Sequence, residues 1–181
     1  MDARSSGQKM ARIRDSYLST SATDAGQLST GQMSVEVVLQ PQNEAGLTSL
    51  LNDLYTPGKS DYGHWLAAGQ FDSEFAPSQA TVSAVTAYLQ SEGLTVQPTS
   101  TPFLLRAIGS SAQLDAAFAT TIDNYRNAQG VSFYSNATPA SVPASLASSV
   151  LGVVGLTNTV RLQSQATTAT SAGQGSHEPS C

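Results

Sequence analysis

Cysteine, histidine and charged residues are scarce in this 181-residue chain. It has one cysteine, Cys181, two histidines, His64 and His177, and 12% charged residues, about half the usual share. A lone cysteine cannot form an internal disulfide, and with two distant histidines it does not make a metal site. No apolar run reaches the roughly 18 residues of a membrane span, and the first residues lack the apolar core of a signal peptide. We therefore expect no disulfide, no metal, no membrane partner and no signal peptide in this chain.

Catalytic motifs are equally absent. The sequence has no P-loop, no dinucleotide fingerprint and no G-x-S-x-G elbow, so we expect no catalytic, cofactor-binding or metal-binding residues. The net charge is −5 and no long basic run occurs, which argues against nucleic acid as a partner. His64, next to the single tryptophan, could serve an unrecognised hydrolase together with a Ser or a carboxylate, although no spacing selects such a pair. Asn136-Ala137-Thr138 is a candidate glycosylation sequon if the chain is exported.

The apolar pattern predicts an α+β fold. Residues 1–31 are polar and aperiodic, and we interpret them as a disordered tail. Ordered structure then begins with a strand at 35–39, stopped by Pro41. Leu47, Leu50, Leu51 and Leu54 follow helical spacing, with Asn43 as a cap. The remaining expected elements are a long helix in 78–93 capped by Ser78, strands at 94–98 and 103–109, a helix at 111–119, a hairpin in 121–135, and a short helix with a Val-rich strand in 142–158.

This order indicates an antiparallel, ferredoxin-like sheet with helices on one face, plus an extra helix and a hairpin. The second sheet face would then be open, and an open face is a candidate binding surface. Residues 32–162 form the expected domain, and the low-complexity segment 163–181 is interpreted as a linker.

A run near the middle of the chain carries a more specific signal. Pro57, Ser60, Tyr62-Gly63, Leu66, Gln70-Phe71 and Phe75-Ala76-Pro77-Ser78, followed by a helix that ends in Gly-Leu, resemble the activation prodomain of the sedolisin family of serine-carboxyl peptidases, the kumamolisin-like and tripeptidyl-peptidase-like enzymes. The resemblance extends over about Val35 to Asn158. One departure is Asp61, where the family pattern often has Pro.

The resemblance implies a propeptide that acts as an intramolecular chaperone and as an inhibitor released in acid, with the cognate peptidase catalytic domain as partner and an extracellular location. It also implies that this chain is not itself an enzyme: the catalytic domain, which binds calcium in the family, would be missing, and no Gly-Thr-Ser nucleophile tripeptide occurs. The alternative that remains open is a stand-alone protease inhibitor or protein-binding module with the same fold.

Within this interpretation the residues of the central run are structural. Tyr62, Trp65, Leu66, Phe71 and Phe75 would pack a corner between the first helix and the long helix, with Gly63 making the turn and Pro77 and Ser78 starting the long helix. The expected interface carboxylates, which would lose partner contacts on protonation, are Glu36, Asp115 and Asp123.

Overall fold

The chain folds around an antiparallel sheet backed by two helices. The computed structural model describes residues 9–15, 22–67 and 69–158. The strands are β1 (Met10–Arg12), β2 (Thr23–Gln27), β3 (Met33–Leu39), β4 (Thr95–Pro98), β5 (Leu104–Gly109), β6 (Ile122–Arg126), β7 (Ser132–Asn136), β8 (Ser141–Pro143) and β9 (Val150–Val154). The helices are α1 (Glu44–Tyr55), α2 (Gln70–Phe75), α3 (Gln79–Ser91), α4 (Ser111–Phe118) and the 3₁₀ turn η1 (Ala144–Leu146).

The central sheet has the strand order β4-β5-β3-β9, with antiparallel neighbours throughout. Helix α3 lies between β3 and β4 in the chain, and α4 lies between β5 and β9. This is the β-α-β-β-α-β order of split βαβ folds. The α+β class is therefore confirmed, whereas the ferredoxin-like assignment stays a prediction that the element order supports.

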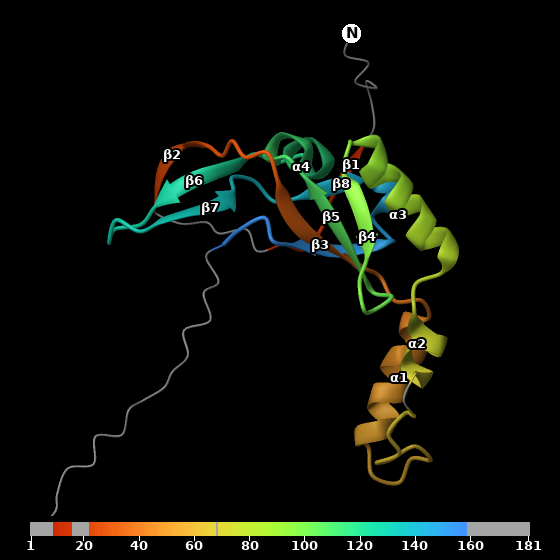
Figure 1. Cartoon of the computed structure of the whole chain (residues 1–181). Helices are drawn as coiled ribbons and strands as arrows, with labels where there is room; N and C mark the ends of the chain where they lie inside the picture. Colours follow the sequence, from red (N-terminus) through yellow and green to blue (C-terminus); the bar gives the residue numbers. More distant parts are fainter. Residues whose placement is uncertain (1–8, 16–21, 68, 159–181) are drawn as a thin grey trace, which may run out of the picture.

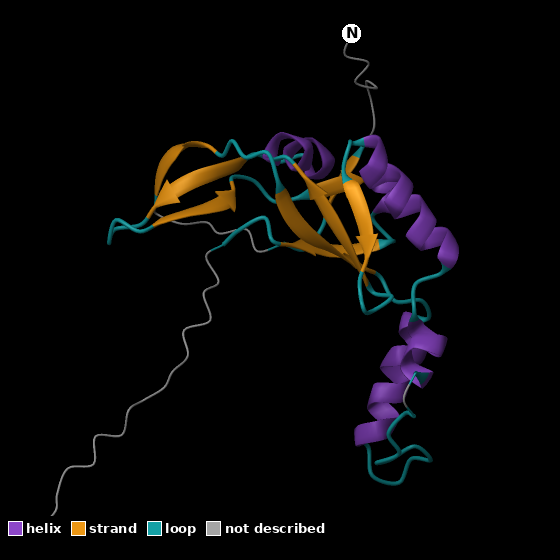
Figure 2. Ribbon diagram, in the orientation of Figure 1, coloured by secondary structure: helices purple, strands orange, loops and turns teal. Residues whose placement is uncertain are grey.

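The core lies between one face of this sheet and helices α3 and α4 (Figure 1). Alternate residues of β3 point into it, because successive side chains of a strand face opposite sides. Figure 2 shows the same division, with the orange central strands beside two purple helices. The fully buried residues from these elements are Val35, Val37, Leu39, Val85, Leu89, Ala107, Leu114, Ala117, Phe118 and Val153.

Local signals position both helices. Ser78 Oγ accepts a hydrogen bond from Thr81 N and caps α3, and Ser110 caps α4 in a capping box with Gln113. Gly93 follows α3 with a φ of 82°, a left-handed conformation that glycine adopts without steric cost. A partly buried hydrogen bond adds to these caps, because the Tyr88 hydroxyl donates to Ala117 O at 2.7 Å. Helix α3 is thereby tied to α4.

Two further groups of strands flank the central sheet. β2, β6 and β7 form a small antiparallel sheet whose β6–β7 hairpin turns at residues 127–131, where Gly130 has a φ of 79°. β1 pairs with β8. Figure 1 shows the β6–β7 hairpin and the α1–α2 region at well-separated ends of the molecule.

The prediction of a disordered tail at residues 1–31 is wrong for the part of this segment that the structure describes. Residues 9–15, here called the N-terminal strap, run beside β8 and β9, and Ile13 is buried in the core. Ile13 N donates to Ala140 O, and Arg14 N donates to Leu151 O. β2 adds an exposed edge strand to the hairpin. Both segments are ordered by backbone pairing with strands distant in the sequence, which leaves no apolar periodicity to detect. The predicted linker at 163–181 lies outside the described residues.

Candidate interaction surface

The face of the central sheet that points away from α3 and α4 is the surface expected from the sequence. We call it the outer face and define it by the side chains that alternate with the buried ones: Ser34, Glu36, Val38, Leu104, Arg106, Ile108 and Val154. Val154 is 54% exposed. The outer face is therefore a mixed surface, with aliphatic side chains around a pair of charges.

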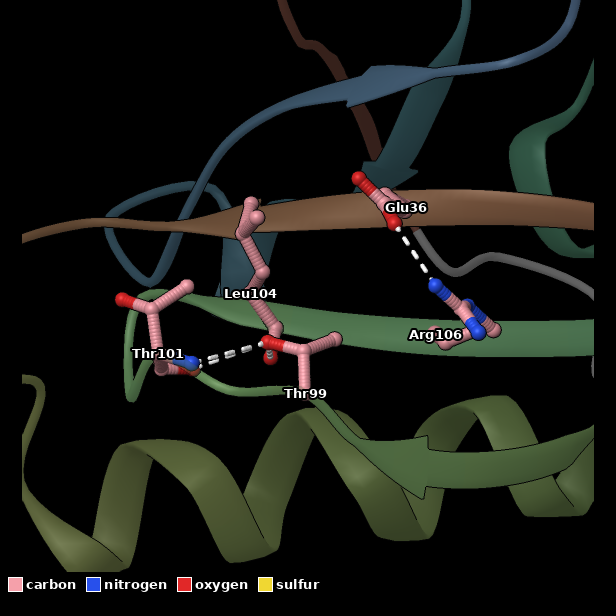
Figure 3. A network of polar contacts seen from close by, with 5 residues as sticks. All are labelled: Glu36, Thr99, Thr101, Leu104 and Arg106. Atoms are coloured by element: carbon pink, nitrogen blue, oxygen red, sulfur yellow. Dashed lines mark hydrogen bonds and ion pairs between the residues drawn. The ribbon is translucent and has the colours of Figure 1, made fainter.

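Glu36 and Arg106 form that pair at the middle of the outer face. They are register partners across β3 and β5, and Arg106 Nη2 donates to Glu36 Oε1 at 3.2 Å (Figure 3). Both side chains stay substantially exposed, at 39% for Glu36 and 48% for Arg106. Each charge can therefore still reach a partner group that approaches the sheet.

A tight turn before β5 fixes where Arg106 lies. Thr101 N donates to the Thr99 hydroxyl, which lies 2.9 Å from Thr101 O and 3.2 Å from Leu104 O (Figure 3). The turn holds the β4–β5 pairing in register, with Gln97 opposite Arg106. Arg106 is thus positioned by a rigid scaffold, although the sequence analysis did not single it out. Its alternation with buried Leu105 and Ala107 was the available signal.

A shallow hollow of about 250 Å³ lies at the β9 edge of the sheet. It is lined mostly by aliphatic side chains and by the N-terminal strap: Arg14, Asp15, Val38, Leu151, Gly152, Val153 and Val154. The strap approaches β9 closely, since Val153 N donates to Arg14 O at 2.8 Å. The hollow extends the outer face to the edge of the sheet.

The run that carried the family resemblance occupies a second surface, the α1–α2 arm, which we define as residues 44–75. Figure 1 shows the arm projecting from one end of the sheet. Phe75 and Pro77 are buried at its base, and Gly63 has a φ of 71° at the turn. Among the four spaced leucines of α1, Leu54 is buried, Leu47 and Leu50 are half-buried, and Leu51 is exposed.

The prediction that the aromatic residues of the run pack together in a corner is wrong for Trp65 and Tyr62. Trp65 is 71% exposed and Tyr62 is 50% exposed. Leu66 is half-buried, and Phe71 keeps 39% exposure while it contacts the rings of Phe75 and Phe103. The physical reason is the position of the arm, which projects from the sheet and has no core of its own large enough to bury these rings. Tyr55, which was not among the predicted residues, contacts Trp65 edge to face, with the two ring centroids 6.0 Å apart.

The expected interface carboxylates fall into different environments. Asp115 is used by the fold, because its oxygens accept from Gln27 Nε2 at 3.0 Å and from Ile122 N at 2.9 Å. Burial raises its pKa and outweighs those two hydrogen bonds, which lower it. Asp123 lies on β6, where burial and then the nearby carboxylates of Asp24 and Asp115 raise its pKa. Only Glu36 lies on the outer face.

The Asn136 sequon, the candidate glycosylation site, is buried in the folded domain. The residue is 1% exposed, and its Nδ2 donates to Asp15 Oδ2 at 2.7 Å and to Thr138 O at 2.9 Å. Asp15 Oδ2 also accepts from Ala140 N. A glycan on this nitrogen would disturb the N-terminal strap, because the amide is one of the groups that hold Asp15.

No cluster of metal-ligating side chains is found in the described ranges. Within them, no three His, Cys, Asp or Glu side chains are grouped so that they could hold a metal ion. His64 is exposed on a turn of the arm. The longest described helix, α3, has 13 residues, and none of the described helices combines the length and the apolar character that crossing a bilayer requires.

Fold and surface together define an α+β domain with two candidate interaction surfaces, the mixed outer face and the aromatic α1–α2 arm. Comparison with known families gives it a place: the family model of the pro-kumamolisin activation domain matches residues 20–159. The chain therefore belongs to the pro-kumamolisin activation domain family.

Two curated relatives are similar to this chain. Xanthomonalisin of Xanthomonas sp. (strain T-22) is 38% identical over 125 residues, which cover 68% of this chain and 15% of the relative. Sedolisin of Pseudomonas sp. (strain 101) is 35% identical over 143 residues, which cover 78% of this chain and 24% of the relative. The matched part thus spans a quarter or less of each relative's length.

Proposed function

We propose that this chain is the propeptide domain of a secreted, acid-acting serine-carboxyl peptidase of the sedolisin type. It binds the peptidase domain of its precursor, assists the folding of that domain and inhibits it until acid releases the propeptide. The observation that carries the proposal is the family match, which spans every described element from β2 to β9. The activity itself would belong to the peptidase portion of the precursor, because the Gly-Thr-Ser nucleophile tripeptide that the resemblance implies does not occur in this sequence.

The outer face supplies the main docking surface in this proposal. Val38, Leu104 and Val154 provide apolar area, and the Glu36–Arg106 pair provides polar groups that specify orientation. A standard interface buries about 800 Å² on each partner, so neighbouring surface would have to add to the outer face in the complex. Aliphatic burial would give affinity, and the charge pair would select the partner.

Acid release follows from carboxylates that gain cationic partners in the complex. Such a carboxylate has a lowered pKa when bound, so its contribution to binding is present above the unbound pKa and is lost as the pH falls through the bound pKa. Glu36 is the candidate on the outer face. Asp115 and Asp123 behave oppositely within the free domain, because their raised pKa values favour the protonated form in the fold. Protonation of these two groups therefore does not destabilise the free domain, and the proposed release rests on carboxylates at the interface.

Inhibition of a relative's peptidase tests the proposal. The purified chain is titrated against mature xanthomonalisin and mature sedolisin at about pH 6 and about pH 3, on either side of ordinary carboxylate pKa values near 4. We expect inhibition of at least one enzyme at the higher pH, weakened at the lower pH. A folded chain that inhibits neither enzyme at either pH would contradict the proposed function.

A further inference from the structure

The α1–α2 arm holds most of the exposed large hydrophobic side chains of the described residues. Large hydrophobic side chains exposed in that part of the chain number eight, and five of them lie on the arm: Leu51, Tyr55, Tyr62, Trp65 and Phe71. The other three, Met10, Val131 and Val154, are scattered over the N-terminal strap, the hairpin loop and the outer face. Aromatic side chains gathered on one projecting element are typical of an interaction surface, whereas singly scattered ones are ordinary.

The aromatic group is held in place before any partner arrives. Tyr55 and Trp65 meet edge to face, with an interplanar angle of 79°. The loop that carries Trp65 is fixed to α1, because Gly63 N donates to Leu54 O at 3.1 Å. Lys59 Nζ lies 3.5 Å from Asp53 Oδ1 and joins the same loop to the helix. Preorganised aromatic rings lose little entropy on binding, which suits them as anchors.

The charge of the arm limits what can cover it. Residues 44–75 contain five carboxylates (Glu44, Asp53, Asp61, Asp72 and Glu74) and one cation, Lys59, which gives 1 − 5 = −4 of the chain's net −5. Two copies that paired through their arms would bring like charges together, which costs free energy. An anionic lipid surface would be repelled for the same reason. The fitting partner has an apolar groove with a basic rim.

We propose that the α1–α2 arm is a second docking surface for the peptidase domain, separate from the outer face, with Trp65 and Tyr55 as its anchors. This inference rests on the proposed function. Both curated relatives contain enough additional chain to supply such a partner domain, because 76% or more of their length lies outside the part that matches this chain. The exposed rings of Tyr62 and Trp65 then act in recognition, whereas the buried Phe75 and Pro77 at the base act in packing.

Variants of the anchors test the inference in the inhibition assay. Trp65→Ala and Tyr55→Ala should each weaken inhibition of the responsive enzyme by about 10-fold or more, as loss of an interface anchor does. Trp65→Phe should recover part of the loss. Val131→Ser is the matched control, since Val131 is 47% exposed on the hairpin loop, away from both surfaces. All variants should keep the unfolding midpoint of the unmodified chain, because these side chains are exposed.

Each outcome distinguishes the two proposals. If the unmodified chain inhibits and the two alanine variants inhibit equally well, the arm is not a docking surface and the proposed function stands. If the unmodified chain does not inhibit, the proposed function fails first and the inference falls with it. Sedimentation equilibrium of the free chain tests whether a second copy occupies the arm. A dimer that Trp65→Ala dissociates would assign the arm to that second copy and overturn the inference.

Discussion

Arg106 Nη2 lies 3.2 Å from Glu36 Oε1, directly across the β3–β5 pairing on the outer face of the sheet. An exposed pair of this kind stabilises a domain by about 0 to 1 kcal/mol. Its charges therefore matter less for the fold than for whatever approaches the sheet.

Replacing Arg106 should separate binding from stability. Arg106→Ala removes the cation and leaves Glu36 exposed to water, so we expect a change of less than about 1 kcal/mol in the free energy of unfolding. Inhibition of a sedolisin-type peptidase should weaken by about 10-fold if the outer face docks. Urea unfolding and inhibition constants measure the two effects. Arg126→Ala, which removes an exposed arginine on β6 outside the outer face, is the control.

Phe75 should support the arm, whereas Trp65 should not. Phe75 is 2% exposed and contacts the ring of Phe71 at 5.2 Å, and removing a buried Phe costs about 3–5 kcal/mol. Because Phe75 lies at the base of the arm, Phe75→Ala should speed amide hydrogen exchange in α1 and α2 and leave β3 and β5 protected. Equal exchange in Phe75→Ala and Trp65→Ala would show that the arm is not built on Phe75.

Gly152 should be needed for the N-terminal strap. A Cβ on this residue would lie 2.5 Å from Arg14 O, which accepts the hydrogen bond from Val153 N. Gly152→Ala must push the strap away from β9, and we expect a loss of about 1–3 kcal/mol in unfolding free energy. The informative second readout is proteolysis at Arg12 and Arg14, which should accelerate. An unchanged cleavage rate would place the strap elsewhere.

Asp123 should make the free domain less stable at neutral pH than in mild acid. Burial, followed by Asp24 and Asp115, raises its pKa above the usual 3.8. A raised pKa means that the charged form costs the fold free energy, so the cost is full above the folded pKa and disappears as the pH falls below the usual value. Asp123→Asn should therefore raise the urea midpoint at neutral pH, with a difference that shrinks toward pH 4. A lower urea midpoint for Asp123→Asn at neutral pH would contradict the prediction.

Periodicity and caps predicted the central sheet and the helices well, because each of those elements carries its own local signal. The alternation of Val35, Val37 and Leu39 and the cap at Ser78 are examples. β1 and β2 carried no such signal: β2 is exposed at every position and is a strand only because β6 offers a free edge. Pairing between segments about 100 residues apart is not encoded in local pattern.

The same limit applies to the candidate site, because tertiary placement decides which of its side chains are exposed. The run around Trp65 stands out in the sequence, but its aromatic residues were predicted to pack, since aromatic residues are usually buried. Whether a ring is buried depends on the size of the cluster around it, and that cluster is set by tertiary placement of the arm. The outer face was expected from the element order, yet Arg106, its central cation, was not.

The most direct test of the central claim is isothermal titration calorimetry of the chain into mature sedolisin whose nucleophilic serine has been replaced, at about pH 6 and about pH 3. The account predicts a one-to-one complex at the higher pH whose affinity falls in acid. A folded chain that gives no binding heat with sedolisin, and none with xanthomonalisin prepared in the same way, would contradict it.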